Sequence, residues 1–180
     1  MATHLDAAAL RARVREAGAG TLRLHNKPPP PGSSRPRITF GGAELAEALA
    51  TEGAGLTGLD LTMQKLGADG WRAVFEALRK GACPRLATLS LYNNDLDPAG
   101  GAALAAALVG CPALTELHVG VNGLGDAGFG ALAEALGRGA CPGMARLKAY
   151  DNKLTVLPEA LCGVASLEEL HLDGNDIGSL

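Results

Sequence analysis

The 180-residue sequence is poor in aromatic residues, which make up 3% of the chain and include one tryptophan and two tyrosines. It has no basic excess, because 16 lysines and arginines stand against 19 aspartates and glutamates. This balance argues against nucleic-acid binding. No apolar run approaches the ~20 residues that a membrane-spanning helix needs. We therefore expect a water-soluble chain with an aliphatic core and neither a nucleic-acid nor a membrane partner.

The four cysteines form no C-x-x-C pair and no cluster with histidine, so no metal-binding spacing is present. Three of them, Cys83, Cys111 and Cys141, recur at regular intervals, and each is followed by proline. A column of small buried thiols is the favoured interpretation over a disulfide framework. Reduced thiols predict a cytoplasmic location. No phosphate-cradling glycine loop is found either, so we expect no metal and no cofactor.

One pattern of leucines recurs along the chain. Segments that start at residues 86, 114 and 167 read LATLSLYNNDL, LTELHVGVNGL and LEELHLDGNDI, which defines the template L-x-x-L-x-L-x-x-N-x-L. Looser copies start at residues 56 and 144, and a weaker one starts at residue 19. Self-similarity at a nearly fixed period of 28 to 30 residues in the central units predicts a solenoid of stacked units.

Each unit combines two periodicities. Leu89 and Leu91 alternate with polar residues, as expected of a strand with one buried face. Between the strand segments, residues such as Leu66, Gly70, Val74 and Leu78 recur in steps of four, as expected of one face of a helix. The template asparagines lie where each strand turns towards its helix, and we expect a structural role for their amides in bonding unpaired backbone groups. They are Asn94, Asn122, Asn152 and Asn175.

This template resembles the leucine-rich repeat family, and the 28- and 30-residue units resemble its ribonuclease-inhibitor-like class. The resemblance covers nearly everything from Ala19 to Ile177. The segment NKLTVLPEALCGVASL departs from it, because it has the L-x-x-L-P-x-x-L form of the shorter, typical class. We expect no full helix there. The resemblance implies an α/β solenoid, or horseshoe, with a parallel β-sheet on the concave face and helices on the convex face.

We divide the chain into an N-terminal capping helix at 1–18 and a repeat domain of about six repeats at 19–180. Leu10 and Val14, four residues apart, give the capping helix its apolar stripe. Arginines and alanines here are also typical of a transit peptide, but Asp6 and Glu16 argue against one. A Pro-rich loop insertion at 26–37 interrupts the first repeat. We favour a surface loop, and the alternative is a polyproline docking motif.

At the C-terminal end, Leu167, Leu170 and Leu172 belong to a core that a following repeat or cap would normally cover. We expect either that the chain is a fragment of a longer protein or that it associates through this uncapped end. The fragment is the favoured alternative.

Outward-facing strand positions supply the candidate partner-binding residues, and both tyrosines of the chain fall among them. Stacked in register, these positions form a central column with Ser90, His118 and Lys148 and a neighbouring column with Thr62, Tyr92, Gly120 and Tyr150. Asp60, Ser90 and His118 superficially supply a catalytic triad, but the serine would lie between the other two. Asp60 would then be roughly 10 Å from His118. We therefore expect no catalytic residues and no enzyme. The predicted partner-binding set is Asp60, Ser90, Tyr92, His118, Lys148, Tyr150 and His171.

The sequence thus predicts a protein–protein interaction module that binds a folded partner through its concave face. Three alternatives remain open. The chain is similar to the Ran GTPase activators, although it lacks the acidic tail usual in that family. It is also similar to the regulatory repeats of NOD-like sensors, although no nucleotide-binding part is present. The third alternative is a purely architectural spacer.

Overall fold

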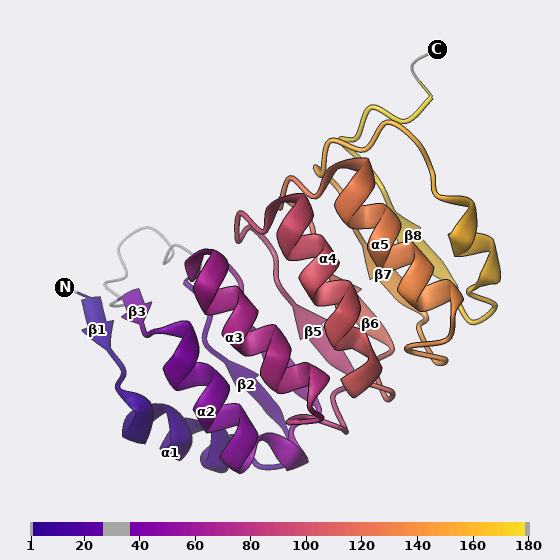
Figure 1. Ribbon diagram of the computed structural model, residues 1–180. Helices are drawn as coiled ribbons and strands as arrows, with labels where there is room; N and C mark the ends of the chain where they lie inside the picture. The colour runs from indigo at the N-terminus through magenta and orange to yellow at the C-terminus, as the bar shows by residue number, and fades with distance from the viewer. Residues whose placement is uncertain (1, 27–36, 179–180) are drawn as a thin grey trace.

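Six short strands lie side by side in a parallel sheet in the computed structural model, which describes residues 2–26 and 37–178 (Figure 1). Each strand pairs in register with the next, so that template leucines such as Leu89, Leu117 and Leu147 stand beside one another. The strands are β2 (Thr21–Arg23), β4 (Gly58–Asp60), β5 (Thr88–Ser90), β6 (Glu116–His118), β7 (Arg146–Lys148) and β8 (Glu169–His171).

Helices line the other side of the sheet and curve with it, as Figure 1 shows. The α-helices are α1 (Ala7–Ala17), α2 (Gly42–Glu52), α3 (Gly67–Arg79), α4 (Asp97–Ala107) and α5 (Gly125–Gly137). Short 3₁₀ segments are η1 (Gly53–Gly55), η2 (Leu108–Gly110) and η3 (Glu159–Gly163). The predicted strand-and-helix solenoid is confirmed. Because η3 takes the place of an α-helix, the expectation of no full helix after residue 152 is confirmed too.

One continuous core fills the space between sheet and helices. Leu59, Leu89, Leu117 and Leu147 are at most 1% exposed, whereas Leu170 on the last strand is 36% exposed. Burial of each inner leucine therefore stabilises the fold by ~1.5–3 kcal/mol, and this burial depends on the neighbouring units.

Glycines let the helices approach one another closely at α4 and α5. A Cβ atom on Gly101 would lie 2.9 Å from the Cα atom of Gly128, which is closer than real Cβ contacts allow. The corresponding place in α3 holds Trp71, whose ring stacks on Phe75. The distance between adjacent helices thus depends on the size of the side chain at this position.

The template asparagines form a ladder through the core. Asn122 illustrates it: Oδ1 accepts hydrogen bonds from the backbone amides of Asn94 (2.9 Å) and Leu96 (3.4 Å). Its Nδ2 donates to the carbonyl oxygens of Leu91 and Val119, both at 2.9 Å. Asn94 and Asn152 make equivalent bonds one unit away, and Asn175 does so in the last unit. The ladder joins each turn to the preceding unit.

The first repeat contains elements that the repeat template does not predict. Strand β3 (Arg37–Thr39) pairs in parallel with β1 (Ala2–His4), and α2 follows it. Asn26 holds β3 with its amide, since Nδ2 donates to the Ile38 carbonyl at 2.8 Å and Oδ1 accepts from the Ile38 amide at 2.9 Å. Residues 27–36, the greater part of the Pro-rich insertion, lie outside the described residues. The proposed docking motif falls there.

Helix α1 lies at the first end of the stack, with Leu10 and Val14 fully buried. The capping role and the domain limits assigned to it from the sequence remain predictions. Within the described ranges, no helix combines the length and the apolar character required to cross a bilayer.

The cysteine column is buried, as predicted. Cys83, Cys111 and Cys141 are reduced and at most 1% exposed, and Cys162 lies outside the column at the surface. Burial raises the pKa of the thiols to about 12, 11 and 12 respectively, so they remain protonated and unreactive at neutral pH.

Candidate functional site

Three of the predicted residues meet on the concave face as one aromatic group, which we call the three-ring cluster: Tyr92, His118 and Tyr150. The Tyr92 and His118 rings stack with centroids 5.2 Å apart. Tyr150 tilts against both, at 5.9 Å from Tyr92 and 5.4 Å from His118. The His118 Nε2 atom lies 3.0 Å from the Tyr150 hydroxyl. All three side chains are half-buried, so part of each ring remains open to solvent.

A glycine makes this convergence possible. Gly120 stands between Tyr92 and Tyr150 in the outward-facing column, and a Cβ atom there would lie 2.8 Å from the Tyr150 Cζ atom. The Tyr150 ring therefore lies across the Gly120 backbone, which is buried beneath it. The sequence predicts both tyrosines in one column, but the room that Gly120 leaves for their rings to meet is a finding of the structure.

Lys148 belongs to a separate ion-pair group. Its Nζ atom lies 2.7 Å from Glu116 Oε1, while Arg146 Nε donates to the other carboxylate oxygen at 3.1 Å. The Lys148 ammonium foremost, and Arg146 with it, hold the pKa of the Glu116 carboxyl below its usual value against the effect of desolvation. Lys148 is thus already engaged within the protein.

The remaining predicted residues lie apart from the three-ring cluster. Asp60 Oδ1 accepts from the Thr62 amide at 3.0 Å, and Ser90 Oγ lies 3.0 Å from Thr62 Oγ1. Thr62, which the sequence placed on the outward face, is 1% exposed. His171 is exposed, with Nε2 3.7 Å from Glu169 Oε2.

The strand register sets Ser90 between Asp60 and His118, so these three residues do not form the order of a catalytic triad. The described part of the chain contains no group of three or more histidine, cysteine or acidic side chains that could hold a metal ion.

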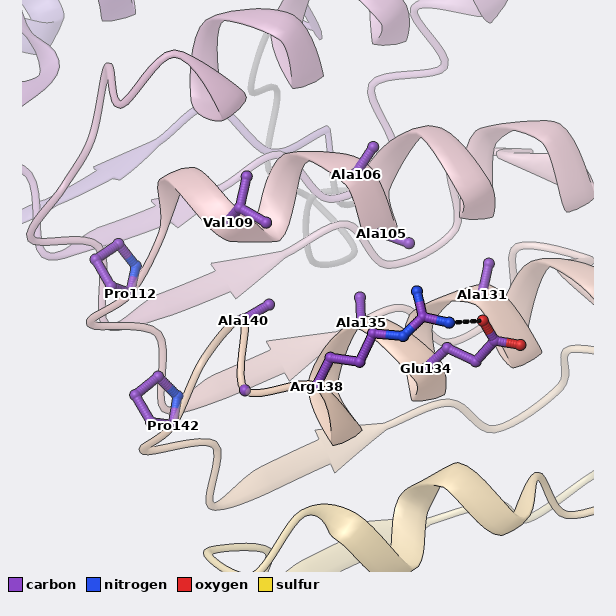
Figure 2. A pocket seen from close by; sticks show the side chains of 11 residues that line it. Ala105, Ala106, Val109, Pro112, Ala131, Glu134, Ala135, Arg138, Ala140 and Pro142 are labelled. Atoms are coloured by element: carbon purple, nitrogen blue, oxygen red, sulfur yellow. Dashed lines mark hydrogen bonds and ion pairs between the residues drawn. The ribbon is translucent and has the colours of Figure 1, made fainter.

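A groove of about 690 Å³ opens on the helical side between the C-terminal ends of α4 and α5 (Figure 2). Beside the groove, η2 packs closely on α3: a Cβ atom on Gly110 would lie 1.9 Å from the Leu78 carbonyl oxygen. Val109, 62% exposed, and several alanines line it. Its charged lining residues, Glu134 and Arg138, pair with each other at 2.9 Å. Ligand sites usually add convergent polar groups to such apolar walls, whereas the two charged residues of this lining already pair with each other.

Comparison with known proteins supports the repeat assignment. A family model described as Leucine Rich repeat matches residues 110–133 and 165–180. The Ran GTPase-activating protein 1 of Xenopus laevis is 33% identical over 152 residues, which cover 81% of this chain and 23% of that protein. The Ran GTPase-activating protein of Drosophila melanogaster is 45% identical over 65 residues, 36% of this chain and 11% of that protein. The chain thus corresponds to less than a quarter of the length of either relative.

Proposed function

We propose that the concave face of this leucine-rich repeat solenoid binds another folded protein. The three-ring cluster carries this proposal. It exposes both tyrosines of a chain that has few aromatic residues. Tyrosine side chains near the centre of an interface often supply a large part of the binding energy. The neighbouring ion-pair group around Glu116 would form part of the polar rim.

Replacing both tyrosines, Tyr92→Ala with Tyr150→Ala, should weaken partner capture from native extract at least tenfold, because two anchors of ~1–2 kcal/mol each are lost. The melting temperature should change little, since both rings are half-buried. Capture is measured by quantitative pulldown and folding by circular dichroism.

Val109→Ala is the matched control, because it removes an exposed apolar side chain from the helical side. It should leave capture unchanged. Equal recovery of partners by the folded double-tyrosine variant and the parent would contradict binding through the concave face.

A second candidate function concerns the partner's identity. The two relatives are named Ran GTPase-activating proteins, and one of them matches 81% of this chain. We propose that the partner is a GTPase of the Ran kind and that this chain accelerates its GTP hydrolysis. The described residues show no catalytic triad, so hydrolysis would use groups that the GTPase itself carries, positioned by the solenoid.

Single-turnover phosphate release from purified GTP-loaded Ran tests this candidate. A stoichiometric amount of the chain should raise the hydrolysis rate at least tenfold, and the double-tyrosine variant should not. An unchanged rate would contradict GTPase activation and agree with the sequence-based prediction that the chain is not an enzyme. Binding of another partner through the concave face would be unaffected by that result.

A further inference from the structure

We propose that the three-ring cluster is the docking site for an arginine side chain of the folded partner. This inference rests on the proposed function, because it specifies the chemistry by which the concave face recognises its partner. It depends on two features of the described residues: a continuous aromatic surface, and carboxylates beside it that have no cation to neutralise them.

The aromatic surface is continuous because the three rings contact one another, with all three centroid separations between 5.2 and 5.9 Å. Because each ring is also only half-buried, the three form one partly exposed aromatic surface, which we call the platform. A planar group can stack on such a platform, and a guanidinium is planar, weakly hydrated and attracted by the negative face of an aromatic ring.

Carboxylates border the Tyr150 side of the platform. Asp151 follows Tyr150 directly, and Asp173 stands beside Tyr150 on the next unit. Both are exposed, and no ion pair of either is found among the described residues. Gly174 leaves room for Asp151, because a Cβ atom at Gly174 would clash with Asp151 Oδ1. These carboxylates can accept hydrogen bonds from the edge of a stacked guanidinium.

The basic side chains of β7 do not cancel this charge, because Arg146 and Lys148 both pair with Glu116. The Tyr150 hydroxyl also experiences the negative charge. Its pKa is raised by burial first, and then by Tyr92 and Asp151. An incoming cation is therefore favoured over a carboxylate. Arginine is favoured over lysine, because a compact ammonium neither stacks nor bonds in a bidentate manner.

The test uses three blocked tripeptides, acetyl-Gly-X-Gly-amide, in which X is arginine, lysine or the uncharged isostere citrulline. Binding to the intact chain is followed by NMR of the tyrosine ring signals, which are easily assigned because the sequence has only two tyrosines. The arginine peptide should shift both signals in a saturable manner. The lysine peptide should bind about fivefold more weakly, and the citrulline peptide should give no saturable shift.

Two variants, one of them with a matched control, test how the carboxylate and the rings bind the arginine peptide. Asp151→Asn keeps a residue that tolerates the left-handed backbone found there, φ 53°, and should weaken arginine binding about fivefold. Asp69→Asn, on the helical side, is its control and should change nothing. Gly120→Ala retains all three rings but displaces Tyr150, so it should abolish the shift of the Tyr150 signal on titration.

The absence of a saturable shift with the arginine peptide, or equal binding of the citrulline peptide, would overturn the arginine site. If partner capture still depended on the two tyrosines in that case, the proposed function would stand and only the arginine chemistry would fail. Capture that did not depend on the tyrosines would contradict the proposed function, whatever the peptides do.

Discussion

Leu117→Asp should abolish cooperative unfolding. Leu117 is fully buried in β6, in register with Leu89 and Leu147 on the two flanking strands. An aspartate there would place a carboxylate among leucines with no cation beside it. The cost of burying such a charge is several kcal/mol, a large part of the ~5–15 kcal/mol that stabilises a typical domain. In a solenoid the loss also breaks the coupling between the units on either side.

Urea unfolding followed by circular dichroism measures this effect, with Leu89→Asp as a second core variant of the same kind. Thr88→Asp is the control, because Thr88 is on the neighbouring strand with an exposed side chain. We expect that variant to unfold as cooperatively as the parent. A cooperative transition in Leu117→Asp at the parent's midpoint would show that the strand register is wrong.

The regular elements could be predicted because each is imposed by a local periodicity. Leu89 and Leu91 are two residues apart, so both face the core only if their segment is a strand. The residues from Leu66 to Leu78 recur in steps of four, so they share one face only if their segment is a helix. The structural role of the asparagine column could be predicted for a similar reason. Where a buried turn leaves backbone groups unpaired, a short amide side chain is among the few that can both donate and accept.

Helix α2 was missed because the Pro-rich insertion separates it from its strand. The template predicts a helix shortly after each strand segment, and here β3 and residues 27–36 intervene. The Pro-rich insertion alone accounts for the long interval between the repeat starts at residues 19 and 56, so the sequence does not require a helix there. Gly42 does hold the same kind of close-packed position as Gly101 in α4: a Cβ atom there would clash with Gly70 on α3. That glycine was a signal that could have identified the helix.

The grouping of the candidate site depends on pairwise contacts that no template contains. Column order places Lys148 beside His118, but the Lys148 ammonium pairs with Glu116 on the adjacent strand. Thr62 was expected to face outward like Tyr92, and instead it is buried against Ser90. Side-chain size and charge at neighbouring strands, rather than period, decide which outward positions form a contact surface.

Asn122→Ala should destabilise the protein by about 3–5 kcal/mol, since leaving a buried backbone group unpaired costs ~1–3 kcal/mol and several partners are affected at once. The substitution removes the acceptor for the Asn94 amide and the donor to the Leu91 and Val119 carbonyls. Asn122 is 3% exposed, so water cannot readily replace these bonds. The change is measured as the difference in free energy of unfolding in urea.

Asn175→Ala is the informative comparison, because Asn175 makes the same kinds of bonds one unit from Asn152 but is only half-buried. Water can reach its partners there, so the expected loss is about 1 kcal/mol, the net contribution of exchanged hydrogen bonds. The loss of stability in Asn122→Asp should lie between those of the two alanine variants, since aspartate keeps the acceptor oxygen and loses the donor. If both alanine variants cost the same, burial does not set the strength of the ladder. The asparagines would then act mainly by fixing the local turn, which is equivalent in each unit.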